Sequence, residues 1–264
     1  MPTPLLICAD DFGYDAAVDE AIASLVAAQR VTATSCLVLS PRWHAAAPLA
    51  RGLFAQADVG LHLDLTEYPH RASLGRVLVA GRLGLLSRAR LRERVATQLA
   101  RFEDTLGEAP RYVDGHEHVH QLPTVSAVLL DELARRYAGA MPWIRVSAPA
   151  APDLKGRIIG AVGATALRRR LDAAGVRHTR RLLGVYDFGT SPPWLDRAAV
   201  WLSQARAGDA LMVHPATRAV SGDPLALARV REHDALASPR FVELLASHGV
   251  VPARGDSLPA AVPA

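Results

Sequence analysis

Short apolar runs alternate with segments of helical periodicity along almost the whole chain of 264 residues. In the clearest helical segment, residues 87–106, apolar side chains recur at spacings of three and four residues. The apolar runs that predict buried strands are residues 5–9, 34–39, 59–65, 112–114, 143–146, 182–185, 210–213 and 250–251. This alternation predicts an α/β protein with a parallel sheet, either open or closed into a barrel.

Charge and composition restrict the partners of such a protein. The formal net charge is +4, but Lys155 is the only lysine among 30 basic residues, and the heavy use of Arg, Ala, Gly and Pro is typical of a GC-rich genome. Only 5% of the residues are aromatic, which leaves little material for stacking on bases. We therefore expect no nucleic-acid partner. The arginine cluster of residues 156–181 fits a solvated helix face better than an anionic membrane surface.

The sequence also predicts a cytoplasmic protein. No apolar run approaches the roughly 18 residues of a membrane-spanning helix. The first residues lack the basic start and the cleavage site of a signal peptide. Cys8 and Cys36 lie in apolar runs, where we expect buried thiols rather than a disulfide.

Acidic residues and histidines gather where the predicted strands end. Because the carboxyl ends of parallel strands open onto one face, residues far apart in sequence meet there. Two long connections, residues 66–87 and 214–237, are also expected on that face and to carry function. The candidate residues are Asp10, Asp11, His62, Asp114, His116, His118, His120 and His214.

Each candidate has a structural alternative. Asp10 and Asp11 could simply cap the helix that follows, but neighbouring carboxylates on a strand point opposite ways, so one could bind a metal while the other approaches water. His62 could be a core histidine whose hydrogen bonds are satisfied inside the protein. His214, which precedes a proline, could simply end its strand. In the run 116–120, three extended histidines would lie about 7 Å apart per step. One ion cannot take all three at about 2 Å, so we expect one or two ligands, with the others supporting them.

Four motifs in a fixed order resemble the YdjC-like family, which contains chitooligosaccharide deacetylase and hopanoid-associated deacetylases. The motifs are Ala-Asp-Asp-Phe-Gly at 9–13, Gly-Leu-His-Leu-Asp-Leu-Thr at 60–66, Asp-Gly-His-Glu-His-Val-His at 114–120, and Met-Val-His-Pro at 212–215. The resemblance implies a distorted, TIM-like (β/α) barrel over residues 1–254, with a loose tail at 255–264.

The resemblance also implies the site and the reaction. Asp11, His62 and His116 would hold a divalent metal ion, Mg²⁺ or Zn²⁺. Asp10 would act as the base and His214 as the acid in hydrolysis of the acetamide of an N-acetylated sugar, in a homodimer. A glycolipid substrate would add peripheral contact with a membrane.

Two other functions remain open from sequence. Another metal-dependent hydrolase, such as a phosphoesterase, would use the same ligands on the same scaffold. A non-catalytic sugar-binding module is disfavoured by the scarcity of aromatic residues, which are the usual platform for sugar stacking.

Overall fold

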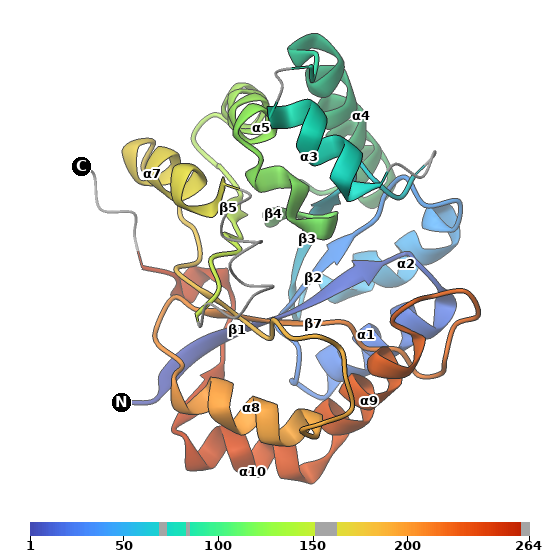
Figure 1. Ribbon diagram of the computed structural model, residues 1–264, viewed down its shortest axis with the longest axis vertical. Helices are drawn as coiled ribbons and strands as arrows, with labels where there is room; N and C mark the ends of the chain where they lie inside the picture. The colour runs from blue at the N-terminus through green and yellow to red at the C-terminus, as the bar shows by residue number, and fades with distance from the viewer. Residues whose placement is uncertain (69–72, 83–84, 151–162, 260–264) are drawn as a thin grey trace.

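The sheet of the computed structural model is parallel and curled. The structure describes residues 1–68, 73–82, 85–150 and 163–259. Its strands follow the order β5-β4-β3-β2-β1-β7-β6, with β8 paired to the start of β1 (Figure 1). The strands are β1 (Thr3–Phe12), β2 (Ala33–Cys36), β3 (Asp58–Leu63), β4 (Tyr112–Gly115), β5 (Trp143–Ile144), β6 (Leu182–Leu183), β7 (Ala210–Val213) and β8 (Val250–Pro252).

Single backbone bridges connect the two edges of this sheet. Ile144 pairs with His178, and Pro149 pairs with Leu182, both in the parallel sense. These bridges bring the β5 edge toward the β6 edge, so the sheet forms a distorted (β/α) barrel. The predicted fold class is therefore confirmed.

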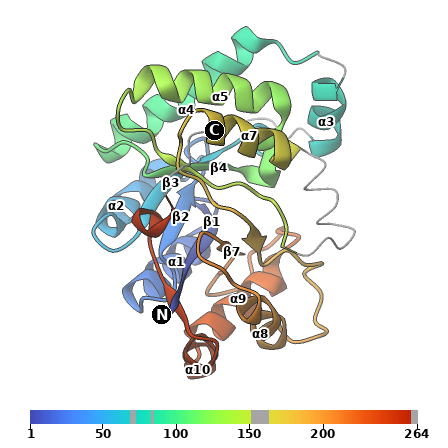
Figure 2. The same cartoon turned by 90° about the vertical axis from the view of Figure 1, so that its left-hand side faces the viewer.

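Helices lie around the outside of the sheet, and α4 and α5 pack side by side in both views (Figures 1 and 2). The helices are α1 (Ala16–Ala27), α2 (Trp43–Leu53), α3 (Leu74–Arg82), α4 (Arg88–Leu106), α5 (Pro123–Arg136), α7 (Thr165–Ala173), α8 (Trp194–Ser203), α9 (Ala226–Ala237) and α10 (Pro239–Ser247). Among the described residues there are also two short 3-10 helices, η1 (His116–Gln121) and η3 (Gly255–Ser257). Across the described residues, no helix is both long enough and apolar enough to cross a membrane.

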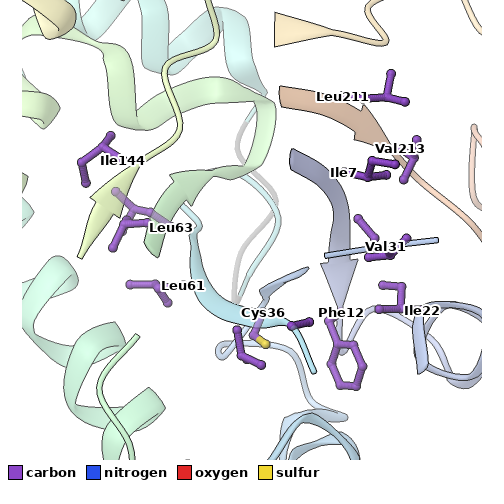
Figure 3. Packing of buried hydrophobic residues seen from close by; sticks show 14 of the residues in the cluster. Ile7, Phe12, Ile22, Val31, Cys36, Leu61, Leu63, Ile144, Leu211 and Val213 are labelled. Atoms are coloured by element: carbon purple, nitrogen blue, oxygen red, sulfur yellow. The ribbon is translucent and has the colours of Figure 1, made fainter. Parts of the chain in front are cut away.

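The core is continuous from the sheet to the helices. Residues of β1 from Leu5 onward are buried, and Figure 3 shows Ile7 beside Leu211 and Val213 of the neighbouring strand β7. Cys8 and Cys36 are free, buried thiols, as predicted. Burying this apolar surface is the main stabilising contribution, and it fixes the strand ends that carry the site.

Several predicted elements differ in detail. Helix α3 lies inside the predicted loop 66–87, and α9 lies inside the predicted loop 214–237. The first part of the arginine cluster of residues 156–181, expected on a helix face, falls outside the described residues, and α7 lies in the part that follows. In the tail expected at 255–264, Gly255 and Leu258 are buried, while 260–264 lie outside the described residues.

Candidate metal centre and active site

Asp11 ends the first strand in an unusual backbone conformation. Its φ of 69° lies in the left-handed region, which non-glycine residues rarely adopt and which costs free energy. The register between β1 and β2 shifts between Ala9 and Phe12, so the strand is irregular here. One carboxylate oxygen of Asp11, Oδ1, lies 3.1 Å from His116 Nδ1 and 3.4 Å from His62 Nε2.

The structure thus brings together the three residues expected to bind metal. Ligand atoms of Asp11, His62 and His116 lie within 4.8 Å of one another. A second group, Asp10, His62 and Asp114, meets the same criterion. In that second group, however, Arg145 contacts both oxygens of Asp10, and both oxygens of Asp114 are also engaged by protein groups. Asp11 keeps one oxygen, Oδ1, whose contacts are the two imidazoles, so the first group is the better candidate.

His62 is oriented by a hydrogen-bonded carboxylate behind it. Asp114 Oδ1 lies 2.6 Å from His62 Nδ1, and Ser35 Oγ lies 3.0 Å from the same nitrogen. Ser35 Oγ also donates to Asp114 Oδ2 at 3.1 Å. Contacts of this kind fix the ring orientation of metal-binding histidines and turn the other nitrogen toward the ion.

Ionisation in this cluster depends on the neighbouring charges. Burial disfavours a charged imidazole, yet the Asp114 carboxylate and a hydrogen bond with Asp11 raise the pKa of His62 to about 10. Burial likewise opposes charge on His116, but Asp11 raises its pKa. Burial would raise the pKa of Asp11, but Arg229 and the two imidazoles hold it well below its usual range. A cation that binds here must therefore displace protons from the histidines.

Asp10 faces a different partner. Arg145, fully buried just after β5, donates to Asp10 from both terminal nitrogens, Nη1 to Oδ1 and Nη2 to Oδ2, each at 2.6 Å. Arg145 Nη2 also lies 2.9 Å from Asp114 Oδ2. Such paired charge-assisted contacts hold a carboxylate in one orientation.

The connected charges balance either when both imidazoles carry protons or when a divalent cation replaces those protons. Four buried carboxylates are linked through contacts of 3.4 Å or less to two buried guanidinium groups and the two imidazoles, which leaves two negative charges when the histidines are neutral. Buried charge is stable only when it is compensated, and a divalent cation would compensate it. These charged residues are Asp10, Asp11, Asp114, Asp223, Arg145 and Arg229.

His214 lies at the end of β7, on the other side of Asp10. Its Nε2 is 3.9 Å from Asp10 Oδ2. Its backbone N–H donates to Glu232 Oε2 at 2.5 Å, and the Tyr186 hydroxyl donates to the other oxygen of Glu232 at 2.6 Å. The ring packs edge-on against Phe188, with centroids 5.5 Å apart. These contacts fix the position of the histidine beside the proposed base.

The other two histidines of the 116–120 run do not join the ligand group. The segment is a 3-10 helix with left-handed residues at Glu117 and His118, not the extended strand considered from sequence. His120 Nε2 bonds the Arg145 carbonyl at 2.8 Å, and burial lowers the pKa of His120 to about 4. Burial and the nearby Arg145 charge keep the pKa of His118 well below its usual value. A Cβ at Gly115 would lie only 2.9 Å from His120 Nδ1, so a larger residue at this position would force His120 to shift.

The candidate ligand group and the Asp10–His214 pair line one cavity of about 790 Å³. The two long connections both contribute walls: Thr66 and Leu74 from one, Leu225 and Arg229 from the other. Its floor includes Asp10, Asp11, His62, His116 and His214, and its walls include Tyr14, Tyr186 and Phe188.

Sequence reasoning assigned no role to several buried residues around the candidate ligands. Ser35 and Arg145 lie in or beside predicted strands, and Asp223, Arg229 and Glu232 lie in the segment predicted as a loop. The available signal for Arg145 was its place at the carboxyl end of the predicted strand 143–146.

The fold and the site together define the class: a parallel (β/α) barrel with a buried Asp-His-His candidate metal centre at the carboxyl ends of its strands. The family model described as YdjC-like protein matches residues 4–247. The chain belongs to the YdjC-like family.

Named relatives are carbohydrate deacetylases. The chain is similar to a carbohydrate deacetylase of Mus musculus, at 35% identity covering 55% of this chain and 56% of that protein. It is also similar to a chitooligosaccharide deacetylase of Salmonella dublin, at 30% identity covering 52% and 58%. The chain thus matches about half the length of these curated relatives.

Solved structures support the fold. A candidate cellobiose-phosphate cleavage protein of Enterococcus faecalis V583 superposes with a TM-score of 0.73 at 22% identity, covering 97% of this chain and 99% of that one. A family 4 carbohydrate esterase of Streptomyces lividans, in complex with acetate, gives a TM-score of 0.54 at 11% identity, covering 99% and 98%.

Proposed function

We propose that this protein is a metal-dependent carbohydrate deacetylase that hydrolyses the acetamide of an N-acetylated sugar. One observation carries the proposal: the candidate ligand group, Asp11, His62 and His116, shares a cavity with a separate Asp10–His214 pair. An ion site and two groups able to transfer protons are the parts that amide hydrolysis requires. The names of the relatives support the substrate class.

The residues divide the chemistry between them. A divalent ion held by Asp11, His62 and His116 would lower the pKa of water and polarise the acetyl carbonyl. Asp10, held by Arg145, would accept the proton of the attacking water. His214 would donate a proton to the sugar nitrogen, because an amine leaves poorly until it is protonated. The products are acetate and the free amino sugar.

The direct test measures acetate release from a panel of N-acetylated oligosaccharides and lipid-linked glucosamines, with metal content assayed in parallel. Chelation should abolish turnover, and Zn²⁺ or Mg²⁺ should restore it. Full turnover in a metal-free preparation would contradict the proposal. Release of phosphate without acetate would favour a phosphoesterase, and tight glycan binding without turnover would favour a binding module.

His214→Ala should separate two classes of substrate. We expect kcat for acetamides to fall by about 10²–10⁴-fold, the usual contribution of a general acid. Esters with activated leaving groups need no proton, so their kcat should fall far less. The comparison is kcat for both substrates in the same preparation, with His233→Ala on α9 as the control. Equal losses on both substrates would exclude His214 as the acid.

A further inference from the structure

Arg229 contacts Asp11 on the side opposite the two histidines. It projects from α9, is 3% exposed, and donates from Nη2 to Asp11 Oδ2 at 2.6 Å. Its guanidinium carbon lies 5.2 Å from the centroid of the Tyr14 ring. The contact joins residues 218 positions apart in the chain.

A second carboxylate fixes the guanidinium. Arg229 Nε donates to Asp223 Oδ2 at 2.6 Å, and the backbone N–H of Leu225 donates to Asp223 Oδ1 at 2.8 Å. The planar guanidinium is thus held at two of its donors, and both partners are buried. A group held in this way restricts rotation of the Asp11 carboxylate.

The two oxygens of Asp11 therefore have separate partners. Oδ1 faces His62 and His116, whereas Oδ2 is taken by Arg229. Carboxylates bind cations through one oxygen or through both. With Oδ2 engaged by a cation of the protein, only Oδ1 is available to an ion.

We propose that Arg229 is a positioning residue that keeps Asp11 a one-oxygen ligand. This inference rests on the proposed metal site. A catalytic ion needs open positions for water and substrate, and a second bound oxygen from Asp11 would fill one of them. Arg229 would thus favour turnover without strengthening metal binding, since its positive charge opposes that of the ion.

The test loads the protein with Co²⁺ and measures its visible absorption, its affinity by competition with a chromophoric chelator, and kcat for the acetamide. Arg229→Met frees Asp11 Oδ2, so the coordination number should rise and the absorption per ion should weaken. Affinity should stay within about threefold of the starting protein or become tighter, while kcat falls by about 10–100-fold. Arg240→Met, an exposed arginine on α10, is the matched control and should change none of these.

Asp223→Ala is the second variant, because Arg229→Met leaves two buried carboxylates without their partner. It keeps Arg229 but removes the carboxylate that holds Arg229 Nε. The coordination number, the absorption and kcat should therefore change in the same directions by smaller amounts. If Arg229→Met does not fold, this variant decides the question. An unchanged Co²⁺ spectrum, or a loss of affinity greater than about tenfold in a folded variant, overturns the positioning role. Failure of the unmodified protein to bind Co²⁺ would instead overturn the proposed metal site.

Discussion

Asp11→Asn should remove the divalent ion and almost all deacetylase activity. The substitution keeps the shape of the side chain but replaces a charged oxygen ligand with a neutral amide, and it leaves the buried Arg229 with only one of its two carboxylate partners, Asp223. We expect a larger loss of affinity than the roughly 10–100-fold that removal of an outer partner causes. Elemental analysis after gel filtration measures the metal content, and acetate release measures the activity.

Asp15→Asn is the matched control for that experiment. Asp15 caps α1 by accepting from the Ala17 N–H at 2.9 Å, and asparagine caps helices about as well as aspartate. The control should therefore keep both metal and activity. Full metal occupancy in Asp11→Asn would show that Asp11 is not a ligand.

Asp10→Asn should keep the ion and lose the reaction. The amide cannot accept a proton from water, so kcat should fall by about 10²–10⁴-fold, as for loss of a general base. Metal content should remain that of the unmodified protein, because both carboxylate oxygens of Asp10 accept hydrogen bonds from Arg145. The measurement is kcat together with metal stoichiometry on the same sample.

The two variants together distinguish three arrangements. Loss of metal in Asp10→Asn with retention in Asp11→Asn would mean that the roles are reversed. Retention of metal and rate in both would reduce the pair to a structural helix cap. Loss of metal in Asp11→Asn alone, with loss of rate in both, is the result that the geometry supports.

The strands were predictable because their signal is local. Short apolar runs marked all eight strands of the part of the chain that the structure describes. Helix α9 was missed for a physical reason: its buried positions are Ala228, Arg229, Glu232 and Leu236. Charged residues stand where an apolar stripe is expected, because that face of the helix serves the site rather than the core.

The candidate ligands were predictable one by one, but their supporting contacts were not. His62 and Asp11 both lie at the carboxyl ends of predicted parallel strands, and such ends open onto one face of the sheet. The pairing of Arg145 with Asp10 spans 135 positions and depends on where a buried side chain lands in three dimensions. The left-handed turn at Glu117 and His118 was equally hidden, since glutamate rarely adopts that conformation.

The position of β1 in the sheet makes the site depend on segments that are synthesised much later than β1 itself. This strand carries both Asp10 and Asp11, and β2 follows it closely along the chain. Its other neighbours are much later, since Leu6 pairs with Ala210 and Thr3 pairs with Val250. Until those segments are synthesised, one edge of the central strand has no native partner and is open to wrong pairing. Completion of the site therefore waits until β7, and after it α9 with Arg229, have been synthesised.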